Sequence, residues 1–175
     1  MERPVQTTEQ TIFSLAPIID PDSRVLILGS IPGRISLMKQ QYYANQRNHF
    51  WAILFVLFGE AQKNNYVDKL AFLKKHRIAL WDSIRQCMRK GSLDSAIKAE
   101  EPNDIAGLLK MHPGIRLIAF NGGKSRSVFK KYIGFTSIQD VDYIQLPSSS
   151  PVPGRYTKSF EEKVETWRVI RDYLK

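Results

Sequence analysis

Two tyrosines and two asparagines stand within the polar stretch QYYANQRNHFW, which runs from Gln41 to Trp51. An asparagine can orient a water molecule through its carbonyl oxygen while its NH2 group donates a second hydrogen bond. A tyrosine ring offers a flat apolar surface on which a planar ligand can stack. Asn45 and Asn48 could therefore hold a water molecule, and Tyr43 or Tyr42 is the candidate stacking surface.

Each of these side chains also has a structural interpretation. Asn48 directly precedes the apolar run HFWAILFVLFGE and fits the N-cap of a helix. Asn45 has no evident capping or packing role, so it ranks first as the water-positioning residue. Tyr42 and Tyr43 could instead be a packing pair that covers the loop.

Four short apolar runs have the pattern of strands that are buried on both faces. They are RVLILGS, IALW, IRLIAF and YIQLP. They alternate with segments of helical spacing, which predicts βαβ units and a parallel sheet with right-handed crossovers. Ligands of such sheets bind beyond the carboxyl ends of the strands. The segments that follow the four strands should therefore surround one site, and they are GSIPG, WDSIRQC, FNGGKS and LPSSSPVPGRY.

Helices are predicted between and after these strands. The predicted helical segments are 49–60, 64–77, a helix begun by Asn103, the segment after Gly122-Gly123, and a terminal helix begun by the capping box of Ser159 and Glu162. Residues 7–19 are predicted to form an opening helix or an extended arm. No repeat or long linker interrupts the order, so we expect one domain over residues 1–175.

The composition indicates a polyanionic partner. The chain has 175 residues, and 26 Lys and Arg against 17 Asp and Glu give a net charge of +9. Such a charge favours nucleic acid, although it could also be only a basic surface that aids solubility. After the third predicted strand, Lys124 and Arg126 stand near a helix start that could meet a phosphate. Arg155 follows the fourth strand, and Arg34 and Lys39 follow the first.

Other features exclude several classes of protein. The single Cys87 excludes an internal disulfide framework and Cys-rich metal sites, and it fits a reducing compartment. The three histidines have no metal-ligand spacing. No apolar stretch is long enough for a membrane span, and the first residues lack the pattern of a secretion signal. We expect a cytoplasmic protein, associated with the nucleoid if it is prokaryotic, without a metal or organic cofactor.

Taken together and in order, the strand-exit segments resemble the uracil-DNA glycosylase superfamily. GSIPG resembles its first motif, FNGGKS the third-strand exit of its mismatch-specific branch, and LPSSSP its second motif. The stretch with QYYAN and NHFW, and the mid-chain GSLDSAI, are most similar to the hypoxanthine-DNA glycosylase branch. The resemblance covers residues 25–170. It implies a three-layer α/β/α sandwich with a short, central, parallel four-stranded sheet.

The resemblance also implies roles for particular residues. Many members carry, at the position of Ser30, an asparagine that orients the attacking water. Here that role is expected to pass to an asparagine of the Tyr-Tyr loop, with Ser30 as a further catalytic candidate. Asp82 and Asp94 are possible site carboxylates, although each has a capping or turn explanation. The residues expected to hold the base are Gly29, Ile31, Pro32, Tyr43 and Asn121, and those expected to hold DNA are Ser148, Ser149, Ser150, Val152, Arg155, Lys124 and Arg126.

The activity implied is removal of a flipped, deaminated base from DNA, hypoxanthine first, which leaves an abasic site. No lysine stands out as a Schiff-base nucleophile, so strand cleavage is not expected, and a monomer is expected to act on the DNA. Two alternatives remain open. The substrate could be uracil or another mismatched pyrimidine, or the chain could be a catalytically silent DNA-binding module on the same fold.

Overall fold

A computed structural model describes residues 8–155 and 157–175. Four strands form a parallel sheet in the order β3-β2-β6-β7, with neighbours paired in parallel. Their bounds are Val25–Gly29 for β2, Ile78–Asp82 for β3, Leu117–Asn121 for β6 and Asp142–Leu146 for β7. These are the four strands predicted from the apolar runs, and the predicted parallel sheet is confirmed.

Alternate side chains of the sheet enter two separate cores. On β2, Val25 and Ile27 belong to the larger core, whereas Leu26 and Leu28 belong to the smaller one. All four are fully buried. Because successive strand residues point to opposite faces, an uninterrupted apolar run requires helices on both sides of the sheet.

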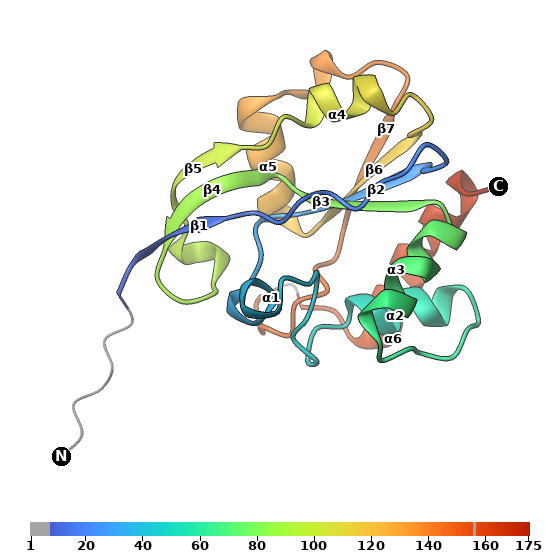
Figure 1. Cartoon of the computed structure of the whole chain (residues 1–175), viewed down its shortest axis with the longest axis horizontal. Helices are drawn as coiled ribbons and strands as arrows, with labels where there is room; N and C mark the ends of the chain where they lie inside the picture. The colour runs from blue at the N-terminus through green and yellow to red at the C-terminus, as the bar shows by residue number, and fades with distance from the viewer. Residues whose placement is uncertain (1–7, 156) are drawn as a thin grey trace.

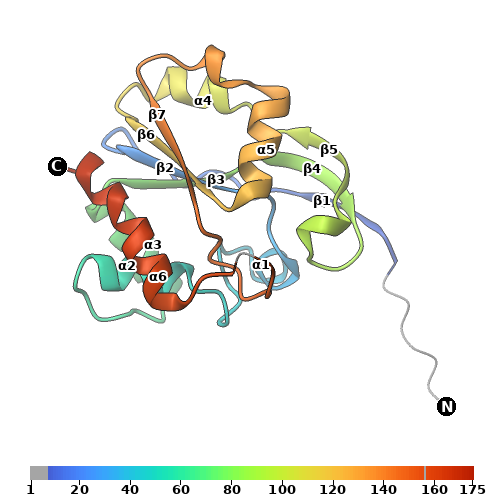
Figure 2. The same cartoon turned by 180° about the vertical axis from the view of Figure 1, so that it is seen from behind.

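Helices cover both faces of the sheet, as Figures 1 and 2 show. The larger core holds residues of α2 (Phe50–Leu57), α3 (Tyr66–Lys75) and α6 (Phe160–Trp167). The smaller core holds residues of α4 (Ile105–Met111) and α5 (Gly123–Tyr132). The predicted three-layer α/β/α arrangement is thus confirmed. The shorter elements are α1 (Arg34–Lys39), η1 (Asp94–Ala96), η2 (Phe135–Ser137) and η3 (Arg168–Tyr173).

A second, antiparallel sheet of three strands was not predicted. It has the order β1-β4-β5, with bounds Gln10–Phe13, Ile84–Arg89 and Lys98–Pro102. The sequence IRQCMR was interpreted as a loop because it is polar, but buried Ile84, Cys87 and Arg89 lie among more exposed residues. Cys87 and Arg89 alternate with exposed Met88 as in a strand with one buried face, whereas register shifts in the pairing with β5 between Ile84 and Met88 break the alternation with Ile84. The opening segment takes its extended alternative as β1, except for residue 7, which lies outside the described residues.

The two sheets meet at a single residue. Ser83 alone separates β3 from β4, and buried Asn103 holds the backbone at this point. Its Nδ2 atom donates to the carbonyl oxygens of Asp82 at 2.8 Å and Ile84 at 3.2 Å. Asn103 was predicted to cap α4, but the side chain of Asp104 does this by accepting from the backbone N–H of Gly107.

Two further sequence expectations concern helix ends and membranes. The side chain of Ser159 caps α6 by accepting from the backbone N–H of Glu162 at 3.2 Å, as the capping box predicts. Among the described residues, no helix is long and apolar enough to cross a membrane.

Replacing Asn103 with alanine should destabilise the protein by about 1–3 kcal/mol, because buried carbonyl groups lose their donor. Urea denaturation followed by circular dichroism measures this free energy of unfolding. As a control, Lys110→Ala on the exposed side of α4 should change it by less than about 0.5 kcal/mol. Equal stability of both variants would show that Asn103 does not hold the junction.

Candidate active site

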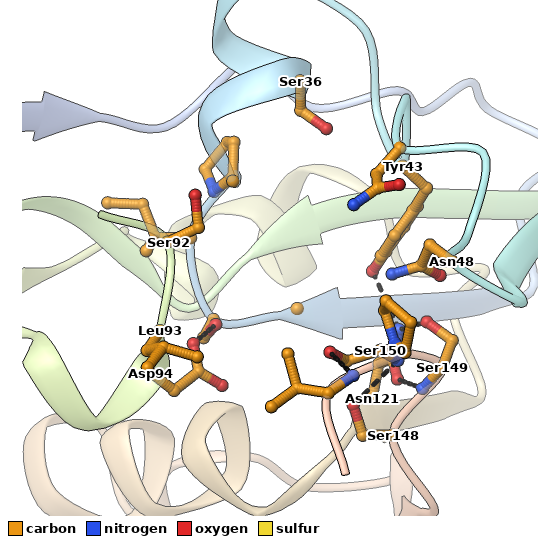
Figure 3. A pocket seen from close by; sticks show the side chains of 18 of the residues that line it. Ser36, Tyr43, Asn48, Ser92, Leu93, Asp94, Asn121, Ser148, Ser149 and Ser150 are labelled. Atoms are coloured by element: carbon orange, nitrogen blue, oxygen red, sulfur yellow. Dashed lines mark hydrogen bonds between the residues drawn. The ribbon is translucent and has the colours of Figure 1, made fainter.

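The segments after all four parallel strands meet around one cavity of about 470 Å3 (Figure 3). This volume lies within the range of small-molecule sites. The carboxyl ends of the four strands therefore surround one site, as the parallel sheet predicts. The lining includes the predicted residues Gly29, Ser30, Ile31, Pro32, Tyr43, Asn45, Asn48, Asn121, Ser148, Ser149, Ser150 and Val152, together with Asp82, Ser92 and Asp94.

The turn after β2 forms part of the cavity wall and requires glycine at its first position. A Cβ atom on Gly29 would lie 2.5 Å from Asp82 Oδ1 and 3.0 Å from the Tyr43 hydroxyl. Any side chain there would displace the groups that the cavity brings together. The next residue, Ser30, donates from Oγ to Asp94 Oδ1 at 2.7 Å. The turn is thereby joined to the segment before β5.

A buried arginine fixes the same wall from behind. Arg89 donates from Nη2 to the carbonyl oxygen of Pro32 at 2.6 Å and from Nε to that of Gly91 at 2.8 Å. It is 1% exposed. One guanidinium group therefore joins the turn after β2 to the segment after β4. The sequence analysis missed this role.

The Tyr43 ring stacks on another side chain at the cavity, whereas Tyr42 belongs to the larger core. The Tyr43 ring stacks on Phe50 with ring centroids 3.8 Å apart and planes at 15°. Its backbone φ is 51°, in the left-handed region that non-glycine residues adopt at a cost of about 1–3 kcal/mol. Tyr42 is 4% exposed and donates from its hydroxyl to the carbonyl oxygen of Ala16 at 2.8 Å. Both tyrosines line the cavity, and the role of Tyr43 as a stacking surface for a ligand stays a prediction.

Asn121 connects two of the cavity walls through its amide group. Its Nδ2 atom donates to Ser149 Oγ at 2.8 Å and to the Tyr43 hydroxyl at 3.2 Å. Its Oδ1 atom accepts from the Ser149 backbone N–H at 2.8 Å. Figure 3 shows these bonds at the base of the cavity. Asn121 therefore positions the loop after β7, while its predicted contact with a base edge stays a prediction.

Both candidate asparagines line the cavity, and both also have local structural roles. Asn48 Oδ1 accepts from the Phe50 backbone N–H at 2.9 Å, at the start of α2. Asn45 Oδ1 accepts from the Arg47 backbone N–H at 3.0 Å, so the expectation that Asn45 has no structural role is wrong. An amide oxygen has two lone pairs, so either group can still accept from a water molecule.

The stretch that carries Asn48 is fixed to the loop after β7. The backbone N–H of His49 donates to the carbonyl oxygen of Ser149 at 2.9 Å. Buried Lys163 lies 3.2 Å from His49 Nδ1 and 3.3 Å from the carbonyl oxygen of Ser150. Burial, with the Lys163 charge as a smaller cause, lowers the pKa of His49. A neutral His49 can accept from the ammonium group, and neither residue was predicted to have this role.

Asp82 contributes a carboxyl group to the cavity floor. It is 4% exposed, and among the described residues its Oδ2 atom has no hydrogen-bond partner. Burial and, as a smaller cause, the Asp94 charge raise the pKa of Asp82 to about 7 against the opposing effect of Arg89. Its position at the end of a buried strand was the sequence signal for this residue. Within residues 8–155 and 157–175, no cluster of His, Cys, Asp and Glu suited to holding a metal ion occurs.

The predicted basic residues differ in whether they line the cavity. Lys124 Nζ is 3.9 Å from Glu100 Oε1, and the Arg126 guanidinium lies over the Phe135 ring at 5.2 Å. Neither lines the cavity, whereas exposed Arg34 does. Arg155 is exposed and directly follows Gly154, a lining residue.

Comparison with known proteins agrees with this architecture. The family model of the Uracil DNA glycosylase superfamily matches residues 16–171. The chain is 36% identical, with a TM-score of 0.79, to the solution NMR structure of a candidate uracil DNA glycosylase from Methanosarcina acetivorans. That likeness covers 94% of this chain and 99% of the other.

The curated relatives are similar over much of their length. A protein named hypoxanthine DNA glycosylase from Methanosarcina acetivorans is 42% identical over 149 residues, which are 85% of this chain and 92% of that protein. Another of the same name from Methanosarcina barkeri is 44% identical over 110 residues, which are 62% of this chain and 70% of that protein. The chain belongs to the uracil DNA glycosylase superfamily.

The buried carboxyl group should make stability depend on pH. A folded-state pKa raised from 3.8 to about 7 means that the folded protein retains a proton that the unfolded chain releases. The free energy of unfolding should therefore fall as pH rises from about 4 to 7, by about 2–4 kcal/mol.

Asp82→Asn cannot ionise at this position, so it should remove this part of the pH dependence. Urea denaturation of both proteins at pH 5 and pH 8 measures the difference, and the variant should gain most at pH 8. An equal response of the two proteins to pH would show that Asp82 titrates near its ordinary value.

Proposed function

We propose that this protein is a DNA glycosylase that hydrolyses the N-glycosidic bond of deoxyinosine and releases hypoxanthine, leaving an abasic site. The observation that carries this proposal is the single cavity at the sheet edge, where the Tyr43 ring and two asparagine side chains line the same space. The name shared by the two Methanosarcina relatives supports hypoxanthine as the base. The acting unit is the chain of residues 1–175 as a monomer, with DNA as its partner.

The cavity supplies what this hydrolysis needs. A flipped base requires a flat surface, and the Tyr43 ring is held in place by Phe50. As the C1′–N9 bond breaks, its electron pair leaves with the base and the sugar gains cationic character, as in other glycoside hydrolyses. The oxygen of a positioned water then bonds to C1′, and its released proton balances the one that the free base finally carries. Because such a sugar reacts readily, a neutral amide suffices to orient the water.

Asn48 is the favoured residue for this water, ahead of Asn45. Asn48 lies at the start of α2, and its neighbour His49 is bonded to the carbonyl oxygen of Ser149. Asn45 is followed by exposed Gln46 and Arg47. A water-positioning group has to hold its geometry through the reaction. Asn48 is held by its hydrogen bond to the start of α2 and by the bond between its neighbour His49 and the loop after β7. Ser30, which lies beside Asp94, assists from the opposite wall.

The DNA is expected to lie across the open side of the cavity. Ser148, Ser149 and Ser150 can hold the phosphates that flank the flipped nucleotide. Val152 is 51% exposed at the tip of the same loop and can occupy the space left in the base stack, as apolar side chains do in proteins that distort DNA. Arg34 and Arg155 supply positive charge along the rim.

A defined substrate test separates this function from its alternatives. Duplexes with one deoxyinosine, one deoxyuridine or neither are incubated with the protein, and alkali then reveals abasic sites. Cleavage of the deoxyinosine strand only after alkali supports the proposal. The intact strand before alkali would show that the protein does not itself cleave the strand. Preference for deoxyuridine would move the substrate to uracil, and intact strands that are nevertheless bound would indicate a silent DNA-binding module.

Asn48→Ala should slow single-turnover excision by about 10²–10⁴-fold, the usual value of a positioned proton-transfer or water-orienting group. Asn48→Ser is the matched control, because serine can still accept from the Phe50 N–H but cannot reach the water like an amide. Both variants should be slow, while Asn45→Ala stays within threefold of the parent. The reverse order would assign the water to Asn45.

Binding should weaken steeply with salt if the rim contacts phosphates. Each contact contributes about 0.9 to the slope of log affinity against log salt on duplex DNA. Arg34→Ala and Arg155→Ala should each lower the slope by about one unit, measured by fluorescence anisotropy. Lys124→Ala and Arg126→Ala should lower it less, since neither residue lines the cavity, and Lys74→Ala on α3 should not change it. An unchanged slope in both rim variants would place the DNA elsewhere.

A further inference from the structure

The carboxyl group of Asp82 belongs to the cavity lining and is almost completely buried. Asp82 ends β3 and is paired in register with Gly29 at the end of β2. Its Oδ1 atom lies 2.5 Å from where a Gly29 Cβ would stand, so only glycine allows the carboxyl group to reach the cavity. The side chain both lines the cavity and is 4% exposed.

Asp82 has an oxygen that the surrounding protein does not satisfy. Oδ2 is buried and has no hydrogen-bond partner within the described part of the chain. A buried polar atom without a partner costs free energy, and in native proteins such an atom calls for an explanation. Asn103 binds the Asp82 backbone and not its carboxyl group. The fold therefore holds this carboxyl group in place through the main chain.

The charged and titratable groups around Asp82 come from three elements. Burial and, to a smaller extent, Asp94 of η1 raise the pKa of the carboxyl group, and Arg89 of β4 lowers it. Tyr42 and Tyr43 come from the loop before α2, and burial with the Asp82 charge as a smaller cause raises the pKa of both, so they stay neutral. Arg89 donates to the carbonyl oxygens of Pro32 and Gly91. With a pKa of about 7, a substantial fraction of Asp82 is protonated at neutral pH.

A protonated carboxyl group is a hydrogen-bond donor, which an ionised one is not. Hypoxanthine carries acceptors at N3, N7 and O6, and all three gain electron density as the C1′–N9 bond breaks. A donor aimed at such an atom binds the transition state more strongly than the ground state, and this difference is what accelerates a reaction. A carboxyl group kept neutral by an apolar site serves other enzymes in this way.

Resting on the proposed function, we propose that protonated Asp82 touches the flipped purine and donates a hydrogen bond to one of its acceptor atoms as the base leaves. The proton stays on Asp82, so the step adds no atom to the hydrolysis described above. The contrasting role is an ionised Asp82 that stabilises the cationic sugar. The two roles require opposite protonation states and therefore predict opposite responses to pH and to amide substitution.

The test is single-turnover release of hypoxanthine from a deoxyinosine duplex between pH 6 and pH 9. Excision by the parent protein should fall as pH rises through about 7, as Asp82 loses its proton. Asp82→Asn keeps an N–H donor at every pH, so it should retain excision and lose this fall. Asp82→Ala should be slower by about 10²-fold at pH 6, the usual loss for one transition-state donor.

Asp94→Asn gives an independent check with Asp82 intact. Removing the Asp94 charge lowers the Asp82 pKa, so the fall in excision should move to lower pH. A purely structural role for Asp82 would not move this profile. Circular dichroism and binding to a duplex with an uncleavable abasic analogue verify that each variant is folded and binds DNA.

Three results would overturn the inference. Excision that rises with pH, with Asp82→Asn as slow as Asp82→Ala, would assign the ionised role. Full excision by Asp82→Ala would remove Asp82 from the reaction. An unmoved profile in Asp94→Asn would attribute the pH dependence to another group. A parent protein that releases no hypoxanthine at any pH would instead overturn the proposed function, so the two failures are distinguishable.

Discussion

Both faces of the parallel sheet are buried, and this constraint decides where the protein can do chemistry. The alternation of Val25 and Ile27 with Leu26 and Leu28 commits each face to its own core. Side chains on the strands are then unavailable to a ligand, and polar groups can gather only where strands end. In a parallel sheet the four carboxyl ends lie at one edge, so the exits of β2, β3, β6 and β7 share one cavity.

The cavity is held together by polar groups that bind one another. The Asn121 amide contacts Ser149 and the Tyr43 hydroxyl, Ser30 contacts Asp94, and Arg89 holds two loop carbonyl groups. Except for the bond from Arg89 to Gly91, each bond joins segments that are distant in the sequence. Such preorganisation leaves little rearrangement for the moment of reaction, and it explains why a site made of loops can keep its geometry.

The fold was largely predictable because its signals are local. Four apolar runs identify the strands, and their alternation with helices fixes a parallel sheet. The antiparallel sheet was missed because IRQCMR carries a mixed pattern in which polar and buried residues are adjacent. The cap of α4 was misplaced by one residue, since Asn103 and Asp104 are both good caps and only burial shows that Asn103 faces inward.

The site was predictable in its members but less so in their roles. The motifs GSIPG and LPSSSP and the Tyr-Tyr loop contribute lining residues, as expected. Which groups bind one another depends on contacts across long sequence separations, and no local pattern encodes these. The pairing of Lys124 with Glu100 and the approach of Asp82 to Gly29 are of this kind. The same limitation applied to Lys163, which the sequence places on an ordinary amphipathic helix.

Ser83, the one residue between β3 and β4, limits which parts of the cavity wall can differ between family members. Two sheets joined so closely cannot rotate independently, so the wall formed by Ser92 and Asp94 moves as one body with the floor at Asp82. The opposite wall, residues 148–154, has no regular secondary structure and is attached by the Asn121 side chain and by the backbone N–H of His49. Accommodation of bases of different size should therefore arise by changes in that loop, with the other wall serving as a constant reference surface.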